Sequence, residues 1–181
     1  MNKTKSSKDK VSKKAKTVTK NKIKKTIKKR KIVMVSGGFD PIHIGHIRYI
    51  QAAKKLGDYL VVVLNNDNWL RKKKGKEFMG EFERKEILEA ISGVDNVIIS
   101  SHKKNTKDMS VCEEVLKIKP DIFANGGDRK PDWDPVPEVS LCKELNIKMV
   151  YNVGYGGKVR SSSELVKKYS KHLKKYETKR N

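Results

Sequence analysis

The stretch that most constrains the fold is residues 33–50, which read VMVSGGFDPIHIGHIRYI. An apolar run at 32–35 leads into a turn containing Gly37 and Gly38, and an amphipathic pattern follows from Ile44. A strand–turn–helix junction of this kind presents the first peptide N–H groups of the helix beyond the turn. Because these groups and the helix dipole attract negative charge, the junction predicts an anion-binding site.

Strand-like and helix-like segments alternate along the rest of the chain. The run 58–64 is almost continuously apolar, which is typical of a strand covered on both faces in a parallel sheet. This alternation predicts an α/β fold with a doubly wound, five-stranded, Rossmann-like parallel sheet. The expected strands are 32–36, 58–64, 97–99, 121–124 and 147–151, and the expected helices begin near residues 44, 81, 111, 138 and 161.

Two helices carry more detailed expectations. In the helix 81–91, we expect Ile87 and Leu88 to face inward and Arg84 to lie on the outer or site-facing side. Ser110 and Glu113 have the spacing of a capping box at the start of the next helix.

The first thirty residues differ from the rest in composition. Residues 1–31 hold 15 of the chain's 43 Lys and Arg but only one of its 21 acidic residues, Asp9. With few large apolar side chains they cannot offset chain entropy, so we expect a disordered basic tail at 1–30. The domain is then expected at 31–176, with a short C-terminal tail at 177–181.

Three interpretations of this tail stay open. It is a solvated extension, a nuclear targeting signal centred on the Lys/Arg cluster 24–31, or an element that attracts nucleic acid. The longest apolar run, 59–64, is far too short to span a membrane. Cys112 and Cys142 fall on apolar helix faces, which indicates core residues rather than a disulfide or metal pair. We therefore expect a cytoplasmic protein, or a nuclear one if the tail acts as a signal.

Two further segments join the first junction at the predicted carboxyl edge of the sheet, where open α/β sheets bind ligands. The first is a Lys-rich stretch, residues 71–76, which we expect to form a basic loop that contacts phosphate. The second is the turn 156–163, in which three serines open the last helix. Ser161 and Glu164 also fit a capping box, which is the alternative explanation of the serines.

The histidines of the first junction, His43 and His46, are separated by a glycine that leaves the backbone bare between them. A helix N-terminus repels a permanent cation, which favours neutral imidazoles that donate hydrogen bonds to phosphate. A zinc site is disfavoured because only Asp40 lies nearby as a further ligand. The sequence contains no P-loop, no GxGxxG turn and no serine nucleophile elbow.

The segment 37–46, GGFDPIHIGH, resembles the first signature of the H-x-G-H nucleotidyltransferase superfamily. The similarity continues in 57–62, in Asp67, in the Arg84–Leu88 segment and in the serines at 161–163, and it covers about residues 31–174. The cytidylyltransferase-like branches acting on glycerol 3-phosphate and the adenylyltransferase domain acting on heptose 1-phosphate are the most similar. ATP and CTP both remain open, and the turn Gly126–Asp128 favours ATP.

The resemblance implies transfer of a nucleotidyl group from ATP or CTP to a phosphorylated alcohol or sugar, with release of pyrophosphate and Mg²⁺ bridging the phosphates. It also implies a homodimer. By resemblance, the catalytic residues would be His43, His46 and Lys73. The nucleotide-binding residues would be Gly37, Gly38, Phe39, Asp40, Gly45, Asp67, Lys76, Gly127, Asp128, Arg160, Ser161, Ser162 and Ser163.

The sequence leaves two alternatives to a nucleotidyltransferase. One is a catalytically reduced nucleotide-binding module whose basic tail binds nucleic acid or directs the protein to the nucleus. The other is a fragment of an aminoacyl-tRNA synthetase, which is disfavoured because the chain lacks a Lys-Met-Ser-Lys-Ser-like loop and room for an anticodon domain.

Overall fold

The computed structural model describes residues 29–127, 137–154 and 161–177, with the side chains of the last helix up to His172. The chain divides into two compact units, Met1–Arg30 and Lys31–Asn181. The fold described below is that of the second unit. The expected disordered tail at 1–30 lies almost entirely outside the described residues.

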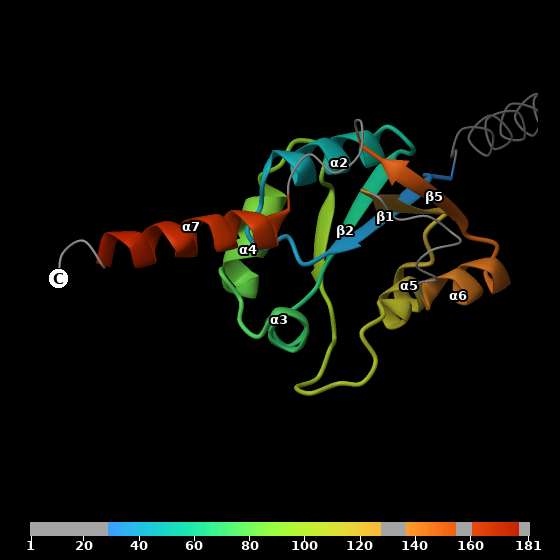
Figure 1. Cartoon of the computed structure of the whole chain (residues 1–181). Helices are drawn as coiled ribbons and strands as arrows, with labels where there is room; N and C mark the ends of the chain where they lie inside the picture. The colour runs from blue at the N-terminus through green and yellow to red at the C-terminus, as the bar shows by residue number, and fades with distance from the viewer. Residues whose placement is uncertain (1–28, 128–136, 155–160, 178–181) are drawn as a thin grey trace, which may run out of the picture. The chain divides into compact units, whose positions relative to one another are not determined.

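The described part of the second unit is built on one sheet of five parallel strands, in the order β3-β2-β1-β4-β5 (Figure 1). The predicted doubly wound, five-stranded parallel sheet is confirmed. The central strands are apolar and buried because helices cover both faces of the sheet. The strands are β1 (Ile32–Gly37), β2 (Tyr59–Leu64), β3 (Asn96–Ile99), β4 (Ile122–Gly126) and β5 (Lys148–Val153).

The helices connect these strands and form two layers, one on each side of the sheet (Figure 1). α2 and α4 contact one face, while α6 contacts β5 and packs with α5 on the other. Each face has its own core cluster, with Leu60 and Val62 in one and Met34 and Phe123 in the other. The helices are α2 (Ile44–Lys54), α3 (Asp67–Lys74), α4 (Glu81–Glu89), α5 (Cys112–Ile118), α6 (Glu138–Glu144) and α7 (Ser162–Glu177).

The expected basic loop at 71–76 is wrong, because residues 71–74 form the last turn of α3. Asn66 caps the start of this helix, accepting a hydrogen bond from the Trp69 N–H at 3.0 Å. Gly75 ends it with φ +86°. Four basic residues in the last turn suit the negative end of the helix dipole, so the lysine run is compatible with a helix.

Two expectations about helices are also corrected. In α4, Ile87 is 38% exposed instead of facing inward, while Arg84 is fully buried and faces the turn after β1, the site-facing one of its two expected positions. The expected capping box at α5 does not form: Val111 is the N-cap, without a side-chain hydrogen bond. The Glu113 carboxylate instead accepts a hydrogen bond from the Ser101 hydroxyl at 2.7 Å. This pairing ties the loop after β3 to α5.

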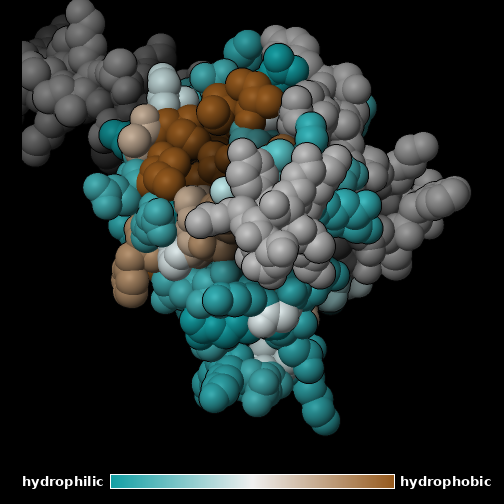
Figure 2. Space-filling view, turned by 60° about the vertical axis from the view of Figure 1, so that its left-hand side comes forward, coloured by the Kyte–Doolittle hydropathy of each residue, from teal (hydrophilic) through white to brown (hydrophobic). Residues whose placement is uncertain are grey.

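Three further features concern the two cysteines, one hydrophobic patch and the helix lengths. Cys142 is buried as expected, Cys112 is half-buried, and both are free thiols. Figure 2 shows one gathering of hydrophobic residues on a face that is otherwise largely hydrophilic. Among the described residues, no helix is both long enough and apolar enough to cross a membrane.

Candidate active site

The order of the strands reverses between β1 and β4, which marks the switch point where α/β sheets bind ligands. These two strands pair at only two positions, Val33 with Ile122 and Met34 with Phe123. Towards their carboxyl ends, the strands no longer pair, and the first junction leaves β1 at this point. The sheet therefore presents the predicted junction at the edge expected for a ligand site.

The two histidines of the junction stack on each other. Their ring centroids lie 3.8 Å apart with 16° between the planes. His43 is the N-cap of α2, and its Nδ1 accepts a hydrogen bond from the Gly45 N–H at 3.1 Å. A neutral His43 therefore carries its proton on Nε2. A methyl group at Gly45 would lie 2.9 Å from His43 Cε1, so the stack requires glycine here.

His46 is held neutral by its surroundings. Burial, followed by the nearby His43 and Lys74, lowers the pKa of His46 from 6.5 to about 3. Its Nδ1 atom is buried and makes no hydrogen bond with the described residues. The ring of Phe39 meets it edge-on, with centroids 5.1 Å apart. A neutral imidazole can still donate one hydrogen bond, which agrees with the expectation from its place at a helix N-terminus.

The lysine that reaches this turn is Lys74. Its ammonium donates a hydrogen bond to the backbone carbonyl of Asp40 at 2.8 Å. Partial burial lowers the pKa of Lys74, and the Asp40 carboxylate partly counteracts this. The expected phosphate ligands Lys73 and Lys76 are both exposed, and within the described residues it is Lys74 of this run whose ammonium bonds to the turn. Sequence reasoning could not choose among adjacent lysines without knowing the phase of α3.

Asp40, expected to bind nucleotide, is engaged within the protein. It is 3% exposed, and its two carboxylate oxygens accept hydrogen bonds from the N–H groups of Phe78 and Met79, each at 2.8 Å. The peptide bond that follows it, to Pro41, is cis. The Asp40 carboxylate therefore anchors the loop that leads into α4 and leaves little capacity for a ligand.

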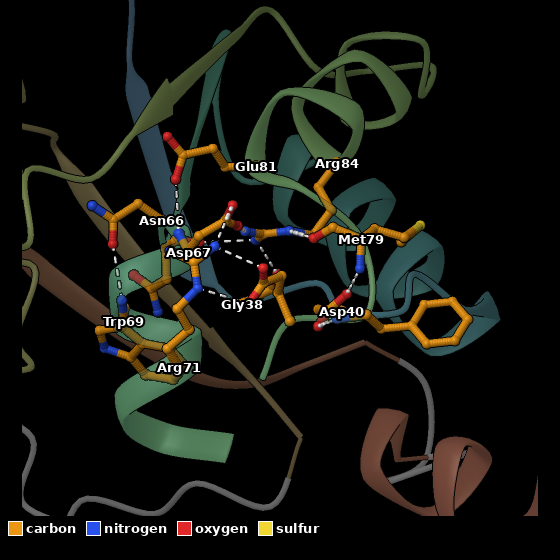
Figure 3. A network of polar contacts seen from close by, with 12 residues as sticks. Gly38, Asp40, Asn66, Asp67, Trp69, Arg71, Met79, Glu81 and Arg84 are labelled. Carbon is orange, nitrogen blue, oxygen red and sulfur yellow. Dashed lines mark hydrogen bonds and ion pairs between the residues drawn. The ribbon is translucent and has the colours of Figure 1, made fainter. Parts of the chain in front are cut away.

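Arg84 was expected on the outer or site-facing side of its helix but was not among the expected catalytic or nucleotide-binding residues. Figure 3 shows its guanidinium reaching from α4 into the space between the turn and α3. It donates hydrogen bonds to the carbonyls of Met79, Gly38 and Asn65, and to the carboxylate of Asp67, over distances of 2.6–2.9 Å. Asp67, another expected nucleotide ligand, is thus paired with an arginine.

The two glycines after β1 allow close packing around the turn. A methyl group at Gly38 would lie 2.9 Å from the Leu70 side chain, which belongs to α3. A methyl group at Gly37 would lie 3.1 Å from the ring of Phe39. Both glycines therefore let the turn approach neighbouring side chains.

The serine-rich start of α7 meets the same turn. The Ser162 hydroxyl donates a hydrogen bond to the Pro41 carbonyl at 3.0 Å. The Ser161 carbonyl accepts the Leu165 N–H, while Ser163 is exposed. Gly127 follows β4 with φ +74°. The other two expected ligands of this edge, Asp128 and Arg160, lie outside the described residues.

No group of three or more His, Cys, Asp or Glu side chains within the described ranges could hold a metal ion. The two acidic residues nearest the turn, Asp40 and Asp67, already accept N–H groups and an arginine. A divalent ion at this site would therefore depend on the oxygens of its ligand and on water, as Mg²⁺ commonly does.

Comparison with known proteins places this geometry in a family. The cytidylyltransferase-like family model matches residues 34–168. An FAD synthase from Thermococcus sibiricus is 34% identical over 144 residues, which is 78% of this chain and 94% of that protein. The bifunctional protein HldE from Pelobacter propionicus is 39% identical over 105 residues, covering 57% of this chain but only 20% of that protein.

One solved structure is also similar. The lipopolysaccharide core biosynthesis protein from Thermoplasma volcanium superposes with a TM-score of 0.56 and 31% identity. The match covers 70% of this chain and 99% of that one. The family match over residues 34–168 and the near full-length FAD synthase show that this chain belongs to the cytidylyltransferase-like family and is a nucleotidyltransferase.

Proposed function

We propose that the protein transfers the adenylyl group of ATP to the phosphate of a phosphorylated alcohol or sugar. An oxygen of the acceptor phosphate forms a bond to the α-phosphorus of ATP. The bond from the α-phosphorus to the oxygen that bridges to the β-phosphorus breaks, and pyrophosphate leaves. CTP is the competing donor. ATP is favoured because FAD contains an AMP unit joined to a flavin phosphate, and an FAD synthase aligns with most of this chain.

The observation that carries the proposal is the stacked histidine pair at the start of α2. His43 has a proton on Nε2, and His46 stays neutral, so each ring can donate one hydrogen bond to an oxygen of the α-phosphate. The charge on these oxygens changes as pyrophosphate departs, and preorganised donors stabilise it. Since the acceptor phosphate is already ionised, the site needs no strong general base.

The surrounding elements would hold the rest of the nucleotide. Lys74 lies beside the turn and supplies a cation for phosphate oxygens. The N-terminus of α7, tied to Pro41 through Ser162, offers peptide N–H groups to the β- and γ-phosphates. Mg²⁺, when bound with the nucleotide, would supply neutralising charge between phosphate oxygens.

The test is a product assay with two donors and a panel of acceptors. Purified protein is incubated with α-labelled ATP or CTP, Mg²⁺ and one of three acceptors: FMN, glycerol 3-phosphate or heptose 1-phosphate. We expect pyrophosphate and a labelled product whose mass equals the acceptor phosphate joined to AMP. Folded protein that releases no pyrophosphate with any pair would refute the proposal. A product that contains CMP would show that the donor is CTP and not ATP.

A matched pair of variants separates this site from a contaminating activity. His46→Ala removes one proposed hydrogen-bond donor at the turn and should lower turnover by about 100-fold or more. Lys85→Met changes a residue of α4 that pairs with Glu89 on the helix surface, and it should leave turnover unchanged. Equal activity of the two variants would show that the product does not come from the histidine turn.

A further inference from the structure

Arg84 is the largest side chain that is completely buried in the described structure. Its N–H groups donate hydrogen bonds to acceptors on four separate segments of the chain. They are the turn after β1 (Gly38), the exit of β2 (Asn65), the start of α3 (Asp67) and the loop before α4 (Met79). Asp67 is the one carboxylate among these acceptors, and the other three are backbone carbonyls.

This arrangement is costly to build. Burying a charged group is unfavourable unless all its donors are satisfied, and an apolar side chain would fill the same space without that penalty. A guanidinium has donors fixed in one plane, so it can hold several acceptors at set distances. A lysine ammonium concentrates its three donors at one point and cannot reach the same four acceptors.

Two of these segments, the turn after β1 and α3, form a closed path with Arg84 and Lys74. Arg84 donates a hydrogen bond to the Gly38 carbonyl in the turn. In the same turn, the Asp40 carbonyl accepts a hydrogen bond from the Lys74 ammonium at 2.8 Å. Lys74 ends α3, and the first residue of that helix, Asp67, returns to Arg84 at 2.6 Å. Arg84 and Lys74 thus fix the two ends of α3 to the same turn.

We propose that Arg84 is a positioning residue that holds Lys74 in place beside His46, so that the lysine and the histidine act together on the bound phosphates. Arg84 itself touches no substrate in this scheme, because its side chain is fully buried and four of its N–H groups bond to protein acceptors. The inference rests on the proposed function for the chemistry at the turn. The placement of Lys74 beside His46 can be tested without any turnover.

The first variant is Arg84→Lys, which keeps a positive charge next to Asp67 but loses the forked geometry. The second is Lys74→Met, which removes only the cation at the far end of the path. The matched control is Lys85→Met, on the next residue of the same helix. Circular dichroism and thermal unfolding establish that each variant is folded before it is compared.

The kinetic readout is a double-mutant cycle. We expect each single variant to lower kcat by about 10- to 100-fold, since small misplacements of catalytic groups have effects of that size. The KM for the nucleotide should change by less than about threefold. If Arg84 acts through Lys74, the double variant should be no slower than Lys74→Met alone. Multiplicative losses, or a raised KM with unchanged kcat, would overturn the inference.

The second readout is the titration of His46 by NMR without substrate. Burial, followed by His43 and Lys74, lowers the pKa of His46, so the wild-type ring should not titrate between pH 5 and pH 8. In Arg84→Lys and Lys74→Met, the pKa should rise to the same extent. An unchanged pKa of His46 in Arg84→Lys would refute positioning even if activity fell. An inactive wild-type protein would count against the proposed function instead, and the titration would still decide the inference.

Should Arg84→Lys fail to fold, Asp67→Asn takes its place in the cycle and in the titration. This variant weakens the link between Arg84 and the start of α3, together with the longer ion pair of Asp67 with Arg71 at 3.8 Å, so it should also be non-additive with Lys74→Met. Additive effects of Asp67→Asn and Lys74→Met would again overturn the inference.

Discussion

The burial of His46 makes the stability of the protein depend on pH in a specific direction. The pKa of this residue is about 3 in the folded protein and 6.5 in an unfolded chain. Below pH 6.5 the unfolded chain therefore binds a proton that the folded protein does not bind. The state that binds more protons is stabilised as the pH falls, which here is the unfolded chain. The free energy of unfolding therefore decreases between about pH 6.5 and pH 3. Above pH 6.5, His46 causes no such decrease.

The size of the loss follows from the same two values. Each pH unit below 6.5 costs about 1.4 kcal/mol for one such group, so a change from pH 7 to pH 5 costs about 2 kcal/mol. For a domain of this size, that corresponds to a decrease in Tm of about 4–8 °C. Other titrating groups add their own pH dependence, so the contribution of His46 must be obtained by difference.

The experiment compares the wild-type protein with His46→Gln, whose side chain does not titrate. Urea unfolding at pH 7 and at pH 5 gives four free energies of unfolding. We expect the wild type to lose about 2 kcal/mol more than the variant over this interval. An equal loss in both proteins would mean that His46 titrates normally when folded. It would then be charged in mild acid, and the conclusion that burial keeps its ring neutral there would be refuted.

Three further substitutions test the geometry of the turn. Gly45→Ala brings a methyl group within 2.9 Å of His43, so kcat should fall by about 10-fold or more while Tm changes little; unchanged steady-state kinetics would contradict this. Asp40→Asn removes one of two hydrogen bonds to loop N–H groups, and urea unfolding should show a loss of about 1–3 kcal/mol; an unchanged midpoint would show that the anchor is dispensable. Lys74→Ala should lower kcat more than Lys73→Ala, because the Lys74 ammonium contacts the turn; equal effects in parallel kinetic assays would assign the role to the lysine run as a whole.

The sheet could be predicted because its strands are short apolar runs that carry their own signal. The run 59–64 is buried along almost its whole length, as its composition indicates. The helix α3 was missed for a local reason. Its lysine run was interpreted as a basic loop that contacts phosphate, although Asn66 at the start and Gly75 at the end are ordinary helix boundary residues.

The histidine turn was predictable because all of its chemistry lies within ten consecutive residues. The network around it was not, since its members are separated in sequence. Asp40 accepts hydrogen bonds from N–H groups 38 and 39 residues later, and Arg84 reaches a carbonyl 46 residues earlier. A charged residue in an amphipathic helix is ordinarily solvent-facing, so no local pattern marks an arginine that is completely buried.

The hydrogen bond from Ser162 to Pro41 joins residues 121 positions apart. The first turn of the domain and its last helix therefore meet only after nearly the whole domain has been synthesised. During translation, β1 and the histidine turn can emerge, and β1 can pair with β2, well before α7 is synthesised. A nascent chain would thus carry only one part of the proposed phosphate site until α7 has been synthesised.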